Sequence, residues 1–179
     1  ERTARTYTDF SLVTTHPGIT NELDQLFEFI SHSYKRFEFR HLLISPLTMR
    51  DSVTRLIQRE INIARAGRAA QITLKVNNLV DERIIDQLYT ASQAGVTIRL
   101  IVRGMCALKP GIAGLSENIS AISIVDRFLE HPRVLIFGND GDPDLFISSA
   151  DLMARNLDGR VEVGCPIYDP ALKQRVLDI

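Results

Sequence analysis

His131 stands in a part of the sequence that could bind or act on an anion. It lies in the segment FLEHPRVLIF, on a Pro-containing turn just before a predicted strand, with Arg127 and Arg133 close to it in sequence. An imidazole beside two guanidinium groups can face a bound anion and exchange a proton with it. The alternative interpretation is a turn histidine that only contacts water. The other three histidines have no comparable neighbours.

Arg103 is a second candidate, because it ends the predicted strand 96–102 and precedes Gly104. Its side chain would then leave the sheet at the carboxyl edge, where α/β sheets bind their ligands. An arginine at this position can equally pair with a structural carboxylate, for which Asp126 and Glu130 are candidates. The position alone leaves both interpretations open.

A third group of candidates lies in the run SSADLMARNLDGRVEV, which follows a short predicted strand. The hydroxyls of Ser148 and Ser149 and the N–H groups of a following helix N-terminus can hold phosphate oxygens. Arg155, one turn later, could add two further donors. The structural alternative is that Ser149 or Asp151 simply caps a short helix.

The elements that must position these residues alternate along the middle of the chain. Three short strands are expected, at 42–45, 72–76 and 96–102. Two amphipathic helices separate them; Thr48 and Asp51 form a capping-box-like start for the first, and Asp81 an N-cap for the second. Strand and helix in alternation predict parallel strands.

The second half of the chain has a different pattern. An irregular stretch, 109–118, precedes four short strands, predicted at 121–125, 134–137, 145–148 and 161–163. Short strands without intervening helices favour antiparallel pairing. The sheet is therefore predicted to be mixed.

The two ends of the chain are expected to differ from this central α/β region. Residues 2–13 are predicted to be extended, and the helix after them has an apolar stripe formed by Leu23, Leu26, Phe27 and Ile30. The polar and aromatic stretch 31–40 is the predicted domain boundary. The last helix, from Pro170 onward, is still periodic at Ile179, which predicts that the sequence is cut from a longer protein.

Composition limits the classes of function that remain. The chain has 179 residues, 45% hydrophobic and 24% charged, which is typical of a folded globular protein. Its net charge of −1 provides no overall field for nucleic acid or anionic membranes, so any anion site must be local. Seventeen of the 21 basic residues are arginines, whose forked donors suit phosphate but also serve in surface ion pairs.

Several familiar motifs are absent from the sequence. Cys106 and Cys165 are too far apart for a CxxC motif, and both are predicted to be buried thiols. There is no Walker loop, no GxGxxG after a strand, no HExxH and no GxSxG. No apolar run approaches the length of a membrane span and the opening residues lack a secretory core, which predicts an intracellular protein.

Longer blocks of sequence resemble a known family. TARTYTDFSLVT, LKVNNLVDERIIDQLYTASQAGV, LIVRGMC, GLSENI, SIVDRFLEHPRV and ISSADLMARNLDGRVEV closely resemble bacterial polyphosphate kinase. That family moves the terminal phosphate of ATP reversibly onto inorganic polyphosphate. The resemblance covers essentially the whole chain and implies an enzyme of the phosphotransferase class.

The resemblance also implies a domain organisation. Residues 1–40 match the end of a first catalytic domain with a phospholipase-D-like fold. Residues 41–179 match most of a second such domain, truncated at its C-terminus. The implied fold class is α/β, with a mixed β-sheet flanked by helices. The histidine that carries the phosphoryl group in this family would lie upstream of Glu1, so the isolated chain is expected to be inactive.

Residue roles follow from the same resemblance. His131 matches the second histidine of the family, which is assigned to nucleotide binding and acid–base assistance. Arg103 matches an arginine that contacts ATP phosphates, and Tyr7 a tyrosine that contacts the nucleotide. Ser148, Ser149 and Arg155 remain candidate phosphate contacts. Mg²⁺ would arrive with ATP, and no metal ligand is expected within this chain.

The resemblance also implies binding partners and a location in the cell, and two other functions remain as alternatives. The implied partners are ATP or ADP, inorganic polyphosphate, the upstream domains and further copies of the whole protein, with no nucleic acid. The implied location is the cytoplasm, with peripheral attachment to the inner membrane as a further option. The alternatives are a stand-alone phosphate- or polyphosphate-binding domain and a phospholipase-D-like phosphodiesterase. Arg133 stands where that superfamily has a motif lysine, and no complete HxKxxxxD is present, which argues against the phosphodiesterase.

Overall fold

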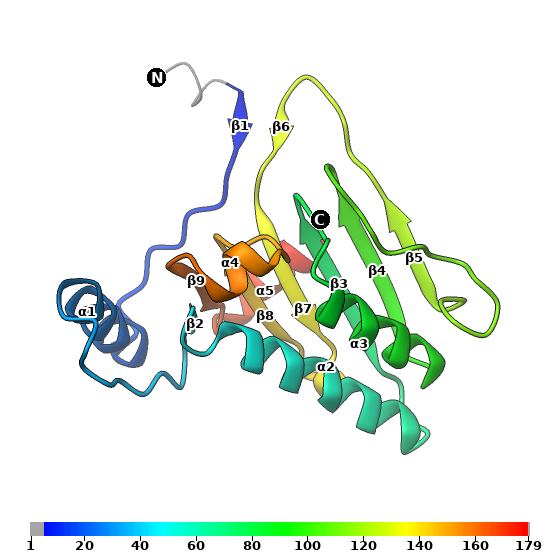
Figure 1. Ribbon diagram of the computed structural model, residues 1–179, viewed down its shortest axis with the longest axis horizontal. Coiled ribbons are helices and arrows are strands. Elements are labelled where there is room, and N and C mark those ends of the chain that lie inside the picture. The colour runs from blue at the N-terminus through cyan, green and yellow to red at the C-terminus, as the bar shows by residue number, and fades with distance from the viewer. Residues whose placement is uncertain (1–5, 179) are drawn as a thin grey trace.

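The computed structural model describes residues 6–178, and the predicted extended residues 2–5 and Ile179 lie outside that range. Figure 1 shows a mixed sheet flanked by helices. Residues 6–16, which precede α1, form a long extended segment that we call the N-terminal strap. The elements in chain order are β1 (Tyr7–Thr8), α1 (Pro17–Ser31), β2 (Leu43–Ser45), α2 (Met49–Arg65), β3 (Gln71–Val76), α3 (Glu82–Gln93), β4 (Thr97–Val102), β5 (Ile119–Ile122), β6 (Leu129–Glu130), β7 (Arg133–Phe137), the 3₁₀ turn η2 (Asn139–Gly141), β8 (Asp144–Ser148), α4 (Ala154–Asp158), β9 (Glu162–Pro166) and α5 (Pro170–Leu177).

The main sheet has seven strands in the order β2-β9-β8-β7-β3-β4-β5, which confirms the predicted mixed sheet. Strands β3, β4 and β5 are parallel neighbours, whereas β7, β8 and β9 pair antiparallel. The prediction for β2 is only partly right, because β2 pairs antiparallel with β9 at the far edge. The three antiparallel strands from the second half of the chain insert between β2 and β3.

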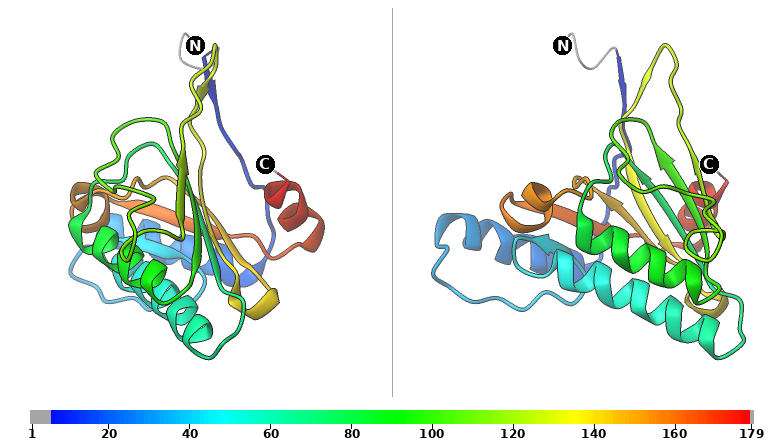
Figure 2. Two further views of the ribbon diagram at one scale, coloured as in Figure 1. Left: turned by 90° about the vertical axis from the view of Figure 1, so that its right-hand side faces the viewer. Right: turned by 45° about the vertical axis from the view of Figure 1, so that its right-hand side comes forward.

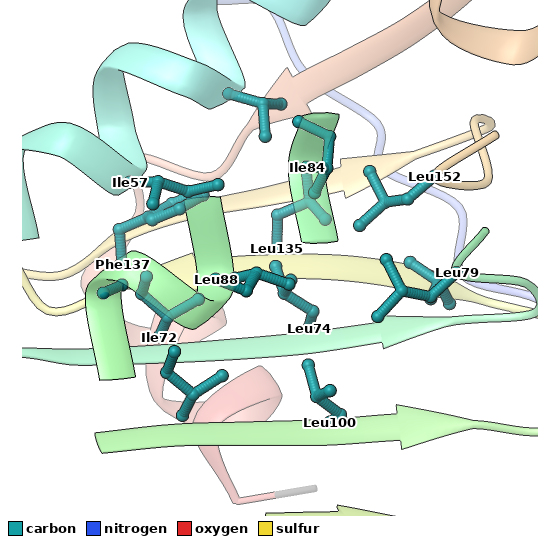
Figure 3. Packing of buried hydrophobic residues seen from close by; sticks show 14 of the residues in the cluster. Ile57, Ile72, Leu74, Leu79, Ile84, Leu88, Leu100, Leu135, Phe137 and Leu152 are labelled. Carbon is teal, nitrogen blue, oxygen red and sulfur yellow. The ribbon is translucent and has the colours of Figure 1, made fainter. Parts of the chain in front are cut away.

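The main core lies between the sheet and the helices α2 and α3. Figure 3 shows Ile57 of α2 and Leu88 of α3 beside Ile72 and Leu135 of the sheet. All four of these side chains are at most 2% exposed. Burial of large aliphatic side chains on this scale is the main driving force for folding of the domain.

The opposite face of the sheet is covered by α5, as the turned view in Figure 2 shows. Leu172 and Val176 of this helix pack on a smaller cluster that includes Val134 and Leu145, and Leu12 of the N-terminal strap joins them. Helix α5 and Leu12 thus cover the same side of the sheet.

The predicted apolar stripe of α1 is partly wrong. Leu26 is 4% exposed, but Phe27 is 66% and Ile30 is 55% exposed. The helix instead buries Glu22, whose carboxylate accepts hydrogen bonds from the backbone N–H groups of Arg40, His41 and Leu42. The same face packs Ile19 and Leu26 against Leu42 and Ile44, so an apolar cluster and the charge-assisted bonds of Glu22 together hold α1 on the protein.

Helix caps were predicted with mixed success. Asp81 accepts a hydrogen bond from Ile84 N at 3.1 Å and is the N-cap of α3, as predicted. Thr48 is the N-cap residue of α2, but its hydroxyl makes no capping bond. The Thr48 Oγ1 atom accepts instead from Ile44 N, so the capping box with Asp51 does not form.

Candidate functional site

Several of the candidate residues lie at one edge of the sheet because of its mixed topology. The carboxyl ends of β3, β4 and β8 meet there, and the antiparallel β7 begins there. Asn77, Arg103, Arg133 and Asp151 therefore lie together although 74 residues separate Asn77 from Asp151. This is the edge where the sequence predicted a site.

The loops that leave these strands are held by close backbone contacts. Gly104 N donates to Asn77 O at 2.8 Å, and Leu152 N donates to Asn78 O at 3.1 Å. A Cβ atom at Gly104 would meet the Asn77 carbonyl oxygen at 2.7 Å, so the approach requires glycine. The loops after β3, β4 and β8 are thus hydrogen-bonded to one another and form one continuous rim along this edge of the sheet.

Asp151 is the centre of the hydrogen bonds at this rim. Its Oδ1 atom accepts from Asn77 N at 2.9 Å and from Arg133 Nε at 3.3 Å, and its Oδ2 accepts from Asn78 Nδ2 at 2.9 Å. The residue is 5% exposed. Asp151 is therefore not a helix cap; the N-cap of α4 is Met153, which makes no side-chain capping bond.

His131 sits between an aspartate and an arginine. Its Nδ1 lies 2.7 Å from Asp9 Oδ1, and Arg133 Nη1 lies 3.1 Å from its Nε2. A carboxylate at Nδ1 favours the tautomer that carries the proton there, which leaves Nε2 with a lone pair. The Tyr7 ring packs edge-on against the imidazole, with 4.9 Å between centroids. Both ring nitrogens are thus hydrogen-bonded, and Nε2 can exchange a proton with a ligand only where the ligand displaces the Arg133 donor from it.

The contact between the N-terminal strap and His131 depends on a short parallel pairing. β1 pairs with β6 in the register Tyr7 with Leu129 and Thr8 with Glu130, and both segments rise from the sheet side by side in Figures 1 and 2. The hydroxyl of Thr8 also donates to the Leu129 carbonyl at 3.2 Å. Backbone pairing thus brings both Tyr7 and Asp9 into contact with the histidine.

Arg103 has no carboxylate partner among residues 6–178. Its Nε donates to Asn77 Oδ1 at 2.5 Å, and this is its only side-chain hydrogen bond within that range. The pairing with Asp126 or Glu130 considered from the sequence is wrong, since Glu130 instead binds Lys75 Nζ at 2.9 Å. Arg103 and Glu130 line a small cavity of about 100 Å³ at this edge. Asp126 and Glu130 line the same cavity, but within residues 6–178 neither carboxylate forms an ion pair with Arg103, whose remaining guanidinium donors have no described partner.

The serines and Arg155 are placed differently. Ser148 lies opposite Arg133 in the β7–β8 register and accepts from Ala150 N at 3.0 Å. The Ser149 hydroxyl donates to the buried carboxylate of Glu162. Arg155 is exposed on α4. Only Ser148 is thus adjacent to the His131 and Arg133 positions.

Sequence reasoning missed some residues of this edge. Asp9 is 122 positions from His131, and no local pattern announces such a contact. The pair Asn77-Asn78 at the end of β3 was a usable signal, since polar residues just after a buried strand are typical of a site. In residues 6–178 no three His, Cys, Asp or Glu side chains are grouped to hold a metal ion.

Comparison with known proteins assigns the chain to a family. The sequence profile of polyphosphate kinase C-terminal domain 2 matches residues 42–179. The chain belongs to the polyphosphate kinase family. A polyphosphate kinase of Vibrio parahaemolyticus is 59% identical over the entire chain. The chain spans 26% of the length of that relative.

Solved structures agree with this assignment. The crystal structure of the polyphosphate kinase from Porphyromonas gingivalis matches with a TM-score of 0.89 and 41% identity, covering 92% of this chain and 25% of that one. A phospholipase D family member, Nuc from Salmonella typhimurium, matches with a TM-score of 0.56 and 16% identity, over 76% of this chain and 88% of that one. The predicted phospholipase-D-like fold is therefore confirmed. No helix within residues 6–178 is both long and apolar enough to cross a membrane.

Proposed function

We propose that this polyphosphate kinase family member supplies the phosphate-binding half of an active site that transfers the terminal phosphate of ATP reversibly to inorganic polyphosphate. The observation that carries the proposal is Arg103, an arginine at the mouth of the sheet whose only described hydrogen-bond partner is the neutral Asn77. It lies on the same edge as the oriented His131. A guanidinium without an ion-pair partner, in such a position, favours a bound anion.

The same proposal includes a division of the chain. Residues 1–40 belong to the end of a first catalytic domain, and residues 41–179 to a second one, in agreement with a family profile that begins at residue 42. The histidine that becomes phosphorylated belongs to the first domain, upstream of Glu1. Asp9, from the first part, then completes the surroundings of His131, from the second.

Each residue has a distinct task in this proposal. Phosphoryl transfer depends on positioning and on stabilising charge at the equatorial oxygens of the phosphoryl group. Arg103 provides forked donors for those oxygens. Asp9 fixes the tautomer of His131, and Nε2 exchanges a proton with the ligand once Arg133, which donates to it in the free protein, turns to the phosphate oxygens. Tyr7, 40% exposed and in contact with His131, offers an aromatic surface to the nucleotide.

Mg²⁺ enters the proposal only as the companion of ATP. Asp151 already accepts three hydrogen bonds, and Asp9 is bonded to His131 through Oδ1. The proposal therefore gives these two carboxylates the task of orienting Arg133 and His131 and assigns no metal ligand to them. A magnesium ion bound through nucleotide phosphates would reduce their negative charge, while Arg103 and His131 contact the phosphates directly.

A binding experiment tests this proposal. The chain is titrated with MgATP and with tripolyphosphate in a calorimeter at low and moderate salt, and the Arg103→Ala and His131→Ala variants are compared with wild type. We expect Arg103→Ala to weaken binding at least tenfold, since a charged hydrogen bond contributes about 1.5–3 kcal/mol. Binding should also weaken as salt rises.

The control is Arg65→Ala, which removes an exposed arginine at the end of α2, away from the site. Its affinity should equal that of wild type, and circular dichroism should show that all variants remain folded. Unchanged binding in Arg103→Ala would exclude the assigned role of this residue. Absence of binding to wild type would show that the half-site is not preformed in this chain.

A further inference from the structure

A second pocket lies at the opposite edge of the sheet. It has a volume of about 330 Å³ and is enclosed by α2, the end of β9, the start of α5 and the residues before β2. Four basic side chains line it, those of Arg40, Arg55, Arg59 and Lys173, and Asp144 is the only carboxylate in the lining. The pocket therefore gathers arginines that the site near His131 does not use.

This pocket is separate from the His131 site. Asp144 is the first residue of β8 and Ser148 its last, and Ser148 lies at the edge with Arg133. Five residues of extended strand separate the two edges by about 13 Å, at roughly 3.3 Å for each step. A ligand in the second pocket would not contact His131 or Arg103.

Arg55 is the cation in this pocket without a charged partner. Its Nη2 donates to the Ser52 hydroxyl at 2.9 Å, and no carboxylate lies within salt-bridge distance among residues 6–178. Ser52 and Arg55 are both on α2, one turn apart, and both line the cavity. The remaining donors of this guanidinium are available to a ligand.

The other three cations are neutralised to different degrees. Arg59 Nη1 binds Asp144 Oδ2 at 2.6 Å and is the firmly paired member. Lys173 Nζ lies 3.3 Å from Asp142, and Arg40 Nη2 lies 3.8 Å from Glu38. The side chains of these two carboxylates are 87% and 88% exposed, and ion pairs in solvent contribute little. Both cations can therefore turn to an anion in the pocket at low cost.

The walls of the pocket also suit a ligand. Leu56, Phe146 and Ile167 provide apolar lining beneath the charged groups. Tyr168 lines the same cavity, and its hydroxyl lies 2.7 Å from His41 Nδ1. Apolar walls reduce the screening of the charges by water and strengthen their attraction for an anion. The volume is at the lower end of the range for small-molecule sites, which is about 300–1,000 Å³.

We propose that this pocket is a second binding site for phosphate groups, with Arg55 as its principal ligand and Lys173 and Arg40 as supporting cations. The ligand class is a short phosphate chain, either free or as the tail of a nucleotide. Forked guanidinium donors match phosphate oxygens, and the lining combines four cations with one carboxylate. The site does not depend on the function proposed for His131, because it shares no residue with that site.

The test follows backbone amide signals by NMR while tripolyphosphate, ADP or adenosine is added to the protein. With tripolyphosphate, we expect one set of shifts near Arg103 and a second set at α2 and the start of α5. Arg55→Gln should weaken binding at the second set about tenfold and leave the first unchanged. Arg103→Gln should do the reverse, so failure of one site is distinguishable from failure of the other.

Matched controls decide between ligand sources and between outcomes. Arg65→Gln, on the same helix but outside the pocket, should titrate like wild type. Binding of ADP but not of tripolyphosphate would identify a nucleotide site, and binding of both a site for phosphate alone. Shifts with adenosine at the pocket, or none at α2 with any phosphate ligand, would overturn the proposal. An Arg55→Gln variant that titrates like wild type would also overturn it.

Discussion

At the scale of single residues, Asp151 determines the shape of the candidate site. All three of its described hydrogen-bond partners are donors, namely Asn77 N, Asn78 Nδ2 and Arg133 Nε. Asn77 in turn accepts from Arg103, and Arg133 donates to His131. One buried carboxylate therefore orients Arg133 directly and holds the backbone of Asn77, whose side chain binds Arg103.

Asp151→Asn should destabilise the protein although it preserves shape. An amide would place an NH₂ group against a donor in either orientation and would leave Arg133 without its charge partner. We expect the free energy of unfolding in urea to fall by about 3 kcal/mol, as when one member of a buried ion pair is removed. Ser148→Ala, which loses one neutral hydrogen bond, should cost about 1 kcal/mol. Equal stability of the two variants would contradict this role of Asp151.

The sequence predicted single residues unevenly. Arg103 could be placed at the mouth of the sheet because the end of a buried strand is visible in the sequence. The contact with its neutral partner Asn77 could not be predicted, because it joins the end of β4 to the end of β3. Ser149 resembled a phosphate ligand, but its hydroxyl donates to Glu162, 13 residues later. Local sequence patterns show which residues lie at the ends of strands. Contacts between distant parts of the chain decide which of their side chains remain available to a ligand.

At the scale of elements, Arg50 connects three helices. It stands in the first turn of α2 and donates two hydrogen bonds to Asp81, the N-cap of α3, at 2.8 and 2.7 Å. It also binds Asp158, the last residue of α4, at 2.6 Å. The hydrogen bonds from Arg50 are the largest cause that lowers the pKa of Asp81. The side chain of Asp81 is 4% exposed, so this contact is screened little by solvent.

The lowered pKa of Asp81 gives a prediction with a sign. A carboxyl whose pKa is lower in the folded state stabilises the fold at any pH above its unfolded pKa, which is about 3.9. This contribution to stability is lost as the pH falls through the pKa of the folded state. Arg50→Met should therefore reduce stability by about 3 kcal/mol at pH 7. The difference from wild type should shrink below pH 4.

Urea unfolding at pH 7 and at pH 3 measures this effect. Arg65→Met, an exposed change on the same helix, should reproduce the wild-type pH dependence. Arg50→Met combined with Asp81→Asn should cost less than the sum of the single changes, because the two residues are directly coupled. A difference between Arg50→Met and wild type that stays constant from pH 7 to pH 3 would contradict the assignment.

Helices and strands were predicted well where the sequence pattern is local. The pairing of strands that are distant in the sequence was predicted less well. The order of strands and helices from β2 to β4 follows from hydrophobic periodicity and from the glycines that end the helices. The position of β2 beside β9 does not, because pairing partners far apart in sequence leave no periodic signal. The buried face of α1 was only partly predicted: it contains Leu26, but also Ile19 and Glu22 in place of Phe27 and Ile30.

At the scale of the whole molecule, the N-terminal strap lies outside the main core. Among residues 6–178, the main hydrophobic cluster begins at Leu43. The strap meets the rest of the protein at β6, at His131 and, through Leu12, at the smaller cluster beneath α5. The residues that complete the candidate site are thus held by a part of the chain that contributes little to the main core.

Deletion of residues 1–10 tests this separation of site and core. The deletion removes the carbonyl groups of Thr6 and Thr8, which accept from Leu129 N at 2.7 Å and from His131 N at 3.3 Å. Hydrogen exchange should therefore become faster at Leu129 and His131, while the amides shared by β3 and β4 keep their protection, because local opening follows local contacts. Asp9→Asn is the matched control, since it changes the side chain bonded to His131 and preserves the backbone pairing. Loss of protection throughout β3 and β4 in the deletion variant would mean that the strap is part of the cooperative core, and the tasks given to Tyr7 and Asp9 could then no longer be separated from folding.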